Sequence, residues 1–323
     1  MTNVLVTGCT GFIGSSITQK LVEDGYNVYG LVRHASRRDL RPLEPILDRL
    51  HLVEGDLTQY HSVCSAISSS RPRFILHLGA LTPVRLSFED PFPYLSTNIN
   101  GTVNLVHAIS ETCPKSRLIF ASTAEVYGWQ QKKEPFKEGL PLNPASPYAV
   151  SKEAADRYIQ MAMKVYGLRA TILRPNNTYG RRSERNFLTE YLISTMVRGQ
   201  TCYVGAPDSV RDYMFVDDHV NAYLLSAKSE KAEGEVFNVS PGNPVTNREL
   251  AETVSNLLDF DGKIVYGSYP PGYPQRPSTW DPNYLVLDSS RIKKALGWQP
   301  SVNLKDGLLR TIDNWLDTHP AEA

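Results

Sequence analysis

The chain has 323 residues, with 34 basic and 34 acidic side chains and a formal net charge of zero. A chain of this length can bury a large core, and its balanced charge argues against nucleic acid or an anionic membrane as a partner. No apolar stretch approaches the roughly 20 residues of a membrane span, and the N-terminus begins with a strand instead of a signal sequence, so we expect a cytoplasmic globular protein.

The first element is an apolar strand that runs into a glycine-rich turn. Asn3-Val4-Leu5-Val6 is followed by Thr7-Gly8-Cys9-Thr10-Gly11-Phe12-Ile13-Gly14 and then by apolar residues at helical spacing. Glycines let the backbone approach a pyrophosphate, and the N-terminus of a helix supplies N–H groups and a positive dipole. The sequence therefore predicts a dinucleotide site at Gly8, Gly11, Phe12, Ile13 and Gly14.

The end of the second strand, predicted over 26–32, bears on which dinucleotide binds. A carboxylate at this position usually binds the ribose 2′-hydroxyl of NAD, whereas this chain has Arg33 there, followed by His34, Arg37 and Arg38. Because an arginine in a basic loop suits a 2′-phosphate, we predict NADP as the cofactor, with NAD as the alternative.

An acidic residue, Asp56, follows the third strand within Glu54-Gly55-Asp56-Leu57. Its carboxylate either binds the adenine amino group of the cofactor or caps a helix that starts near Gln59. Both interpretations stay open at this point.

Further along, strands and helices alternate through the first half of the chain. Apolar runs at 74–78, 118–121 and 170–173 are separated by helical patterns at 97–109 and 148–165. This alternation predicts an α/β fold, a doubly wound parallel Rossmann sheet. We expect residues 1–174 to form the dinucleotide-binding domain, residues 175–323 a smaller C-terminal substrate lobe, and 212–236 to return to the first domain. In the lobe, Thr246 and Glu249 form a capping box for a helix to about Leu258, and another helix should begin at Asp288 and end at Gly297.

The segment Ser146-Pro147-Tyr148-Ala149-Val150-Ser151-Lys152 has the features of a helix start, with Ser146 as N-cap and Pro147 in the first turn. Spacing of four residues places Tyr148 and Lys152 on one face. A nearby ammonium lowers the pKa of a phenol from about 10 toward neutrality. The pair can therefore act as one general base, although a tyrosine four residues before a lysine is also common on helix surfaces.

The cysteines and histidines lack the spacing of metal ligands. Cys9, Cys64, Cys113 and Cys202 form no CxxC motif, and the seven histidines are scattered. We expect reduced thiols and no metal site.

Together these motifs resemble the extended short-chain dehydrogenase/reductase family, the nucleotide-sugar epimerases and dehydratases. Besides the glycine turn and the Tyr148/Lys152 pair, the resemblance rests on Ser122-Thr123-Ala124-Glu125-Val126-Tyr127, His77-Leu78-Gly79-Ala80, Asn98-Ile99-Asn100-Gly101-Thr102, Arg211-Asp212-Tyr213, Val216-Asp217-Asp218, and Leu296-Gly297-Trp298 with Pro300. It covers nearly the whole chain. It implies a nucleotide-diphosphate sugar as substrate and a homodimer or homotetramer, in which helices at about 90–110 and 147–165 pair between subunits.

The resemblance also implies roles for single residues. Thr123 would hold the C4 oxygen of the sugar beside Tyr148, and Glu125 stands where dehydratases of the family carry the base that removes the C5 proton. Further expected cofactor contacts are Leu57, Leu78 and Ala80. The expected substrate contacts are Ser87, Asn177, Arg211 and Arg276, with the two arginines as a diphosphate clamp.

Glu125 favours a 4,6-dehydratase, because the 4-epimerases of the family more often have a small or neutral residue there. Two observations oppose this: Ala124 cannot give a proton to a leaving hydroxyl, and Glu125 could be a solvated loop carboxylate.

A second segment is similar to GDP-mannose 4,6-dehydratases, in which the arginine loop reaches a neighbouring subunit's cofactor. It consists of Asn176-Asn177-Thr178-Tyr179-Gly180-Arg181-Arg182 with Asn186-Phe187-Leu188-Thr189.

Because the loop after Arg33 is shorter than in that branch, UDP-, CDP- and dTDP-sugars stay possible. Three hypotheses remain: a GDP-mannose 4,6-dehydratase-like enzyme; a 4-epimerase of the UDP-glucose or UDP-GlcNAc type or a 4-keto-sugar reductase; and a non-catalytic NADP-binding regulator. The intact Tyr148/Lys152 pair argues against the last.

Overall fold

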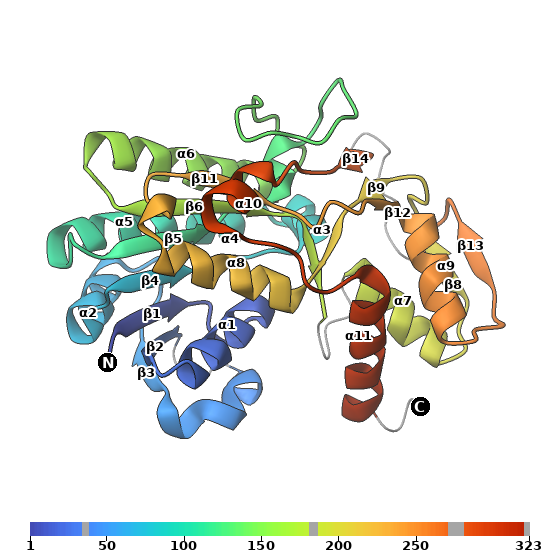
Figure 1. Cartoon of the computed structure of the whole chain (residues 1–323), viewed down its shortest axis with the longest axis horizontal. Coiled ribbons are helices and arrows are strands. Elements are labelled where there is room, and N and C mark those ends of the chain that lie inside the picture. Colours follow the sequence, from blue (N-terminus) through green and yellow to red (C-terminus); the bar gives the residue numbers. More distant parts are fainter. Residues whose placement is uncertain (34–38, 181–186, 271–280, 320–323) are drawn as a thin grey trace.

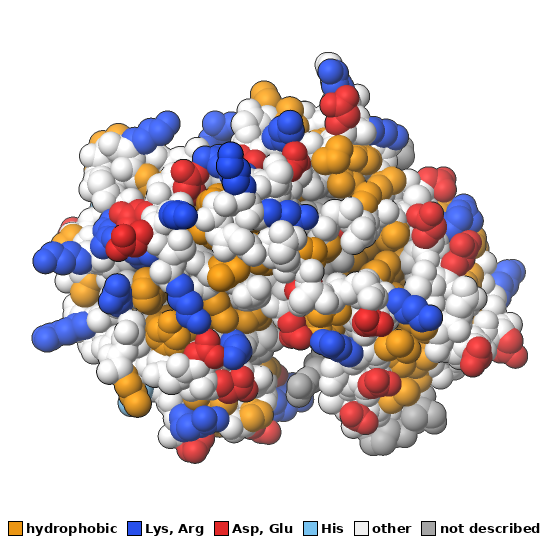
Figure 2. All heavy atoms as spheres, in the orientation of Figure 1, with side chains coloured by type: hydrophobic (Ala, Val, Ile, Leu, Met, Phe, Trp, Pro, Cys, Tyr) orange, Lys and Arg blue, Asp and Glu red, His pale blue; other side chains and the backbone are white. Residues whose placement is uncertain are grey.

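The computed structural model describes residues 1–33, 39–180, 187–270 and 281–319. Figure 1 shows a larger body around a central sheet and, beside it, a smaller lobe that carries α7, α9 and α11. Over the described ranges, no helix is long and apolar enough to cross a membrane. Acidic and basic side chains are interspersed over the face seen in Figure 2, as expected for a chain without net charge.

The central sheet has seven parallel strands in the order β11-β6-β5-β4-β1-β2-β3. Its strands are β1 (Asn3–Thr7), β2 (Asn27–Val32), β3 (His51–Glu54), β4 (Phe74–His77), β5 (Arg117–Ala121), β6 (Ala170–Pro175) and β11 (Val236–Val239). The chain moves outward from β1 in both directions, so the strand order reverses between β1 and β4. The predicted doubly wound Rossmann fold is confirmed, and this reversal is where such sheets bind ligands.

Helices cover both faces of the sheet. One face carries α1 (Phe12–Glu23), the 3₁₀ segment η2 (Arg41–Arg49) and α8 (Val216–Lys228), and the other carries α2 (Tyr60–Ser70), α5 (Gly101–Thr112) and α6 (Pro147–Val165). Successive strand residues point to opposite faces. Val4 and Val6 of β1 accordingly join the core under α1, and Leu5 joins the core under α5.

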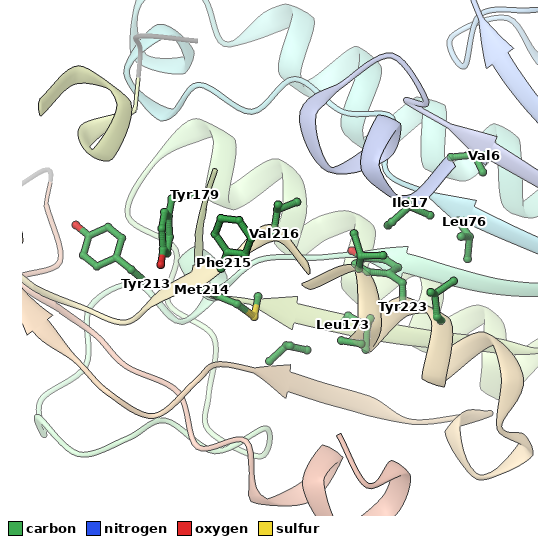
Figure 3. Packing of buried hydrophobic residues seen from close by; sticks show 14 of the residues in the cluster. Val6, Ile17, Leu76, Leu173, Tyr179, Tyr213, Met214, Phe215, Val216 and Tyr223 are labelled. Carbon is green, nitrogen blue, oxygen red and sulfur yellow. The ribbon is translucent and has the colours of Figure 1, made fainter. Parts of the chain in front are cut away.

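The smaller lobe is built from short strands and three longer helices. Its strands are β7 (Asn177–Tyr179), β8 (Cys202–Val204), β9 (Val210–Arg211), β10 (Tyr213–Phe215), β12 (Val245–Thr246), β13 (Ile264–Tyr266) and β14 (Tyr284–Leu285), and its longer helices are α7 (Leu188–Val197), α9 (Asn247–Leu257) and α11 (Leu304–Thr318). One hydrophobic cluster runs from the sheet into this lobe. In Figure 3, Leu173 and Val6 of the sheet belong to the same cluster as Tyr179 and Phe215. Packing therefore fixes the lobe against the carboxyl ends of the strands.

The predicted helix starts are met at two places and corrected at a third. Ser146 Oγ accepts the Ala149 N–H at 3.0 Å at the start of α6, and the capping box of Thr246 and Glu249 opens α9. Helix α10 (Ser290–Leu296) starts after Ser289, not at Asp288. The Asp288 carboxylate instead accepts the Ser290 N–H from just outside the helix.

The segment at 84–112 contains both α-helical and π-helical turns. Short helices α3 (Val84–Glu89) and α4 (Phe92–Tyr94) precede a π-helical turn, η3 (Leu95–Asn100), which continues into α5. π-Helical turns often occur at functional sites. Here the turn carries Asn98, which is 1% exposed.

Beyond 212, the chain returns to the sheet through α8 and β11, and β11 pairs with β6 as far as Val239. The predicted return segment, 212–236, therefore ends three residues before the end of β11 at Val239. The division of the chain at residue 174 stays a prediction.

Candidate active site

A cavity of about 620 Å³ lies at the carboxyl ends of the central strands, where the strand order reverses. Most of the predicted site residues line it. They are Gly8, Gly11, Phe12, Ile13, Gly14, Arg33, Asp56, Leu57, Leu78, Ala80, Thr123, Glu125, Tyr148, Lys152 and Asn177.

Two predicted substrate residues are not among those that line the cavity. Ser87 is fully buried, and its hydroxyl accepts the Tyr148 N–H at 3.1 Å, so it holds the first turn of α6. Arg211 forms an ion pair with Asp281 and donates to the Val210 carbonyl. Its guanidinium is therefore occupied within the lobe in this structure, and its role in a diphosphate clamp stays a prediction.

Other predicted residues lie outside the described part of the chain. They are Arg276, the loop residues His34, Arg37 and Arg38, and the segment with Arg181, Arg182 and Asn186.

The glycine turn fits the pyrophosphate of a dinucleotide. A Cβ on Gly8, whose φ is +72°, would lie 2.7 Å from the Gly79 nitrogen, and one on Gly14 would lie 2.0 Å from the Gly8 carbonyl oxygen. The turn therefore packs against β4 and against itself without room for side chains. Helix α1 begins at Phe12 with no side-chain cap and no acidic residue in its first turn, so the positive end of its dipole is available to an anion.

The adenine side of the cavity has two polar residues. Asp56 is not an N-cap, because α2 starts at Tyr60 after Gln59 and without a side-chain cap. Its carboxylate accepts the Thr58 N–H at 2.8 Å, and the residue lines the cavity, so its contact with an adenine stays a prediction. Arg33 lines the same cavity as an exposed residue at the end of β2.

Burial shifts the pKa values of both Tyr148 and Lys152. The two residues are 8% and 3% exposed. Burial raises the pKa of Tyr148; a hydrogen bond with Thr123 lowers it in part, and the Glu125 carboxylate raises it further. Burial also lowers the pKa of Lys152 to about 7, against the opposite effect of Asp156. Burial therefore favours the neutral phenol of Tyr148, and the role of the Tyr148/Lys152 pair as a general base stays a prediction.

Thr123 and Glu125 lie on the wall of the cavity next to the phenol. Thr123 caps the 3₁₀ turn η4 (Ala124–Tyr127), where its hydroxyl accepts the Glu125 N–H at 3.3 Å. Glu125 lines the cavity and its charge raises the pKa of Tyr148; its role as a base stays a prediction. Ala124, by contrast, is 3% exposed and is not part of the lining.

Several supporting residues were not identified from sequence. His77 lies between the hydroxyls of Thr7 (2.7 Å) and Thr102 (3.1 Å), and its burial and the nearby Lys152 charge lower its pKa to about 3. Asn98 accepts the Leu81 N–H and donates to Ser151 on α6. His77 and Asn98 lie in two of the motifs on which the resemblance rests. These motifs indicated the residues but not the partners that they contact. His219, which also lines the cavity, directly follows the Val216-Asp217-Asp218 motif.

Comparison with known proteins identifies the family. The family model described as GDP-mannose 4,6 dehydratase matches residues 5–311. The chain is 32% identical over 315 residues to the UDP-glucose 4-epimerase of Mycolicibacterium smegmatis, with 96% of this chain and 97% of that protein covered. The structure of the Thermotoga maritima UDP-glucose 4-epimerase with UDP-glucose matches with a TM-score of 0.89 and 32% identity, covering 98% of this chain and 99% of that one. The dTDP-glucose 4,6-dehydratase of Bacillus anthracis in complex with NAD matches with a TM-score of 0.85 and 27% identity, covering 99% and 98%.

The chain belongs to this family of nucleotide-sugar dehydratases and epimerases, within the extended short-chain dehydrogenases/reductases. It is accordingly an enzyme, and the hypothesis of a non-catalytic regulator is set aside.

The depressed pKa of Lys152 makes a testable contribution to stability. Its folded pKa of about 7 lies below its ordinary value of 10.5. The buried ammonium therefore lowers the free energy of unfolding, and this lowering is largest below pH 7 and declines as the pH rises toward 10.5. Between pH 7.5 and 9, the free energy of unfolding of the wild type should therefore gain about 2 kcal/mol relative to Lys152→Met.

Urea unfolding of both proteins at each pH measures this difference. Lys164 is exposed on the same helix. Lys164→Met is the control, because an exposed ammonium is hydrated in both the folded and the unfolded state. A wild type that gains nothing over Lys152→Met across this range would show that Lys152 is not desolvated.

Proposed function

We propose that the chain is a nicotinamide-dependent 4,6-dehydratase of nucleotide-diphosphohexoses, with GDP-mannose as the first substrate to test. The observation that carries the proposal is the position of Glu125 in the cavity, beside Thr123 and Tyr148. A carboxylate here can remove a proton from the carbon next to the oxidised one, and a dehydratase needs that step.

The residues divide the chemistry between them. A bound nicotinamide would supply the hydride acceptor for C4 and later the hydride donor for C6. Tyr148 would take the proton of the C4 hydroxyl, and Thr123 would hold the C4 oxygen beside it. Glu125 would then remove the C5 proton, which the C4 ketone makes acidic. Because Ala124 has no proton to give, Glu125 or a water would deliver this proton to the C6 hydroxyl as it leaves as water. Tyr148 would finally return its proton to C5.

A 4-epimerase is the second candidate, and two observations favour it. The relatives named above include UDP-glucose 4-epimerases at 32% identity, and Ala124 removes the acid that assists a leaving hydroxyl. In that reaction the hydride would return to the opposite face of C4, and no base at C5 would be required.

Substitutions at Tyr148 and Glu125 separate the two candidates. Tyr148→Phe should abolish turnover, since the general base for oxidation is lost. Glu125→Gln should still allow C4 oxidation and stall there, at least about 100-fold slower in product formation. The stalled protein should show the near-ultraviolet absorbance of a reduced nicotinamide.

Turnover of GDP-mannose, dTDP-glucose and UDP-glucose in heavy water gives an independent measurement, read by mass and by NMR. The wild type should release water and carry deuterium at C5. A product of unchanged mass, inverted at C4 and without deuterium at C5, would contradict the dehydratase and favour the epimerase.

For the cofactor we propose NADP, with NAD as the alternative that the Bacillus anthracis relative supports by its complex with NAD. The proposal rests on Arg33, which lines the cavity at the end of β2. Arg33→Ala should weaken NADP by about 10-fold to 100-fold, as expected for one charged hydrogen bond, and should leave NAD nearly unchanged.

Calorimetric titration of both dinucleotides tests this. Arg41→Ala is the matched control, because Arg41 is exposed, pairs with Asp39 and does not line the cavity. Equal losses for NAD and NADP in Arg33→Ala would remove the argument for NADP.

We also propose a homodimer through the face formed by α4, η3, α5 and α6. Helices α5 and α6 pack together at one edge of the body (Figure 1), and this region exposes Phe92 (76%), Val165 (66%) and Val150 (43%). Exposed apolar side chains of this size mark an interaction surface when they gather on one face.

Sedimentation velocity at micromolar concentration should show a wild-type dimer and a monomeric Phe92→Glu/Val165→Glu variant, because two carboxylates would be buried unpaired. The control is Leu309→Glu, at a similarly apolar exposed site on α11. A monomeric wild type would refute this assembly.

A further inference from the structure

A buried ion pair lies directly behind the proposed reaction centre. Tyr148, Lys152, Asp156 and Gln160 follow one another at four-residue spacing on α6 and so share one face. Asp156 is fully buried, and its carboxylate meets Arg174 of β6, which is 2% exposed. The contact is bidentate, with Arg174 Nε 2.9 Å from Oδ2 and Nη2 3.1 Å from Oδ1.

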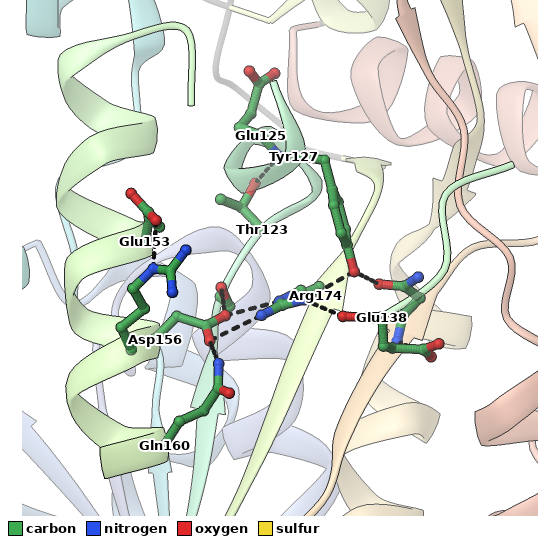
Figure 4. Close-up of polar contacts among 11 residues, drawn as sticks. Thr123, Glu125, Tyr127, Glu138, Glu153, Asp156, Gln160 and Arg174 are labelled. Atoms are coloured by element: carbon green, nitrogen blue, oxygen red, sulfur yellow. Dashed lines mark hydrogen bonds and ion pairs between the residues drawn. The ribbon is translucent and has the colours of Figure 1, made fainter. Parts of the chain in front are cut away.

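The carboxylate of Asp156 is also bound from two other directions. Ser122 Oγ donates to Oδ2 at 2.7 Å, and Gln160 Nε2 donates to Oδ1 at 2.6 Å. Ser122 directly precedes Thr123, so this contact ties α6 to the segment that carries the Thr123 hydroxyl. Figure 4 shows Asp156, Arg174 and Gln160 together below Thr123 and Glu125.

The guanidinium of Arg174 also contacts η4, the turn that carries Glu125. Its Nη1 donates to the Tyr127 hydroxyl at 2.9 Å and to the Glu138 carbonyl at 3.3 Å. Tyr127 ends the turn η4 that carries Glu125, and its hydroxyl donates to Asn238 Oδ1 at 2.7 Å. One ion pair thus connects the helix of Tyr148 and Lys152 with the turn of Thr123 and Glu125.

Stability alone is a weak reason for such a pair. Replacing a buried ion pair by neutral groups of similar volume is often neutral or stabilising, because both charges must be desolvated. Ser122, Gln160 and Tyr127, which bind this pair, instead come from segments that carry, or adjoin, a residue of the proposed reaction centre.

The charge of Asp156 also acts on Lys152. Burial lowers the pKa of Lys152, and Asp156 is the group that opposes this effect. The titratable groups that interact with the Tyr148 and Lys152 region from the surrounding elements are His77 on β4, Tyr94 on α4, Glu125 on η4, Asp156 on α6 and Tyr223 on α8, with Arg174 on β6 bound to Asp156. His77 is neutral at pH 7 because its own pKa is lowered, and Tyr94 and Glu125 act on Tyr148. Asp156 is therefore the described group whose charge favours the ammonium form of Lys152.

We infer that Asp156 and Arg174 are positioning residues: their ion pair holds α6 against the Ser122–Tyr127 segment and gives Lys152 its counter-charge. The inference deepens the proposed function and rests on it for the reaction served, but the placement of charge around Lys152 can be tested without any substrate.

The test is a titration of Lys152 in the full chain without ligand. Protein labelled with ¹³C at the lysine ε-carbons is followed by NMR from pH 5.5 to 9, and the Lys152 signal is the one missing in Lys152→Met. In the double variant Asp156→Asn/Arg174→Met, which removes both charges of the ion pair together, the Lys152 midpoint should fall by about one unit, the lower end of the effect of a nearby opposite charge.

Glu153→Gln is the matched control. This variant also removes one carboxylate charge, from the residue that follows Lys152. The Glu153 carboxylate, however, pairs with Arg157, whose side chain is 61% exposed. The Lys152 titration should not move in this variant. Asp156→Glu, which keeps the charge, should restore most of the wild-type midpoint.

An unchanged Lys152 midpoint in a folded double variant would overturn the inference. Failure of the double variant to fold would overturn it as well, because the pair would then serve the fold itself. A separate measurement concerns catalysis: at pH 8, a midpoint lowered by one unit leaves about one tenth as much charged Lys152, so kcat for the accepted nucleotide sugar should fall about tenfold while KM changes little. If no nucleotide sugar is turned over, the proposed function fails and the titration still decides the inference.

Discussion

Desolvation of one face of α6 is the constraint on which the proposed reaction centre depends. This face buries a phenol, an ammonium and a carboxylate in line, at Tyr148, Lys152 and Asp156. Each of these groups is costly to bury in its charged form, so their protonation responds strongly to what covers them. An enzyme that must move protons near neutral pH can use this sensitivity, because a ligand that closes the cavity changes the same balance.

The sheet explains why these groups meet a cofactor. The reversal of strand order between β1 and β4 opens a crevice at the carboxyl ends of the strands, and the glycine turn after β1 lines one side of it. The core continues without a break into the smaller lobe through Tyr179 and Phe215, so the lobe is held over the same edge. The glycine turn, the proposed reaction centre and the lobe are therefore all held by the central sheet and its core.

Dehydratases and epimerases of the family can share this framework because their first step is the same. What distinguishes them is the turn after β5, where two adjacent side chains decide what happens to an oxidised sugar. Here one of them, Glu125, faces the cavity, and the other, Ala124, is buried and carries no proton. In the proposed mechanism Glu125 is the base and the neighbouring Ala124 cannot act as an acid, so proton delivery to the leaving hydroxyl is its unusual part.

The sequence by itself determined the features that depend on neighbours within a few positions: the strand-turn-helix at Gly8, the Ser146 cap of α6 and the capping box at Thr246. Local spacing is enough for these, because the interacting groups are a turn apart. Only the tertiary structure decided which partner each charge meets. Asp156 meets Arg174 from 18 positions away, and Arg211 meets Asp281 from 70 positions away, and the burial that lowers the pKa of Lys152 depends on elements far along the chain. Electrostatics acts through space and scales with desolvation, so no local pattern could have predicted it.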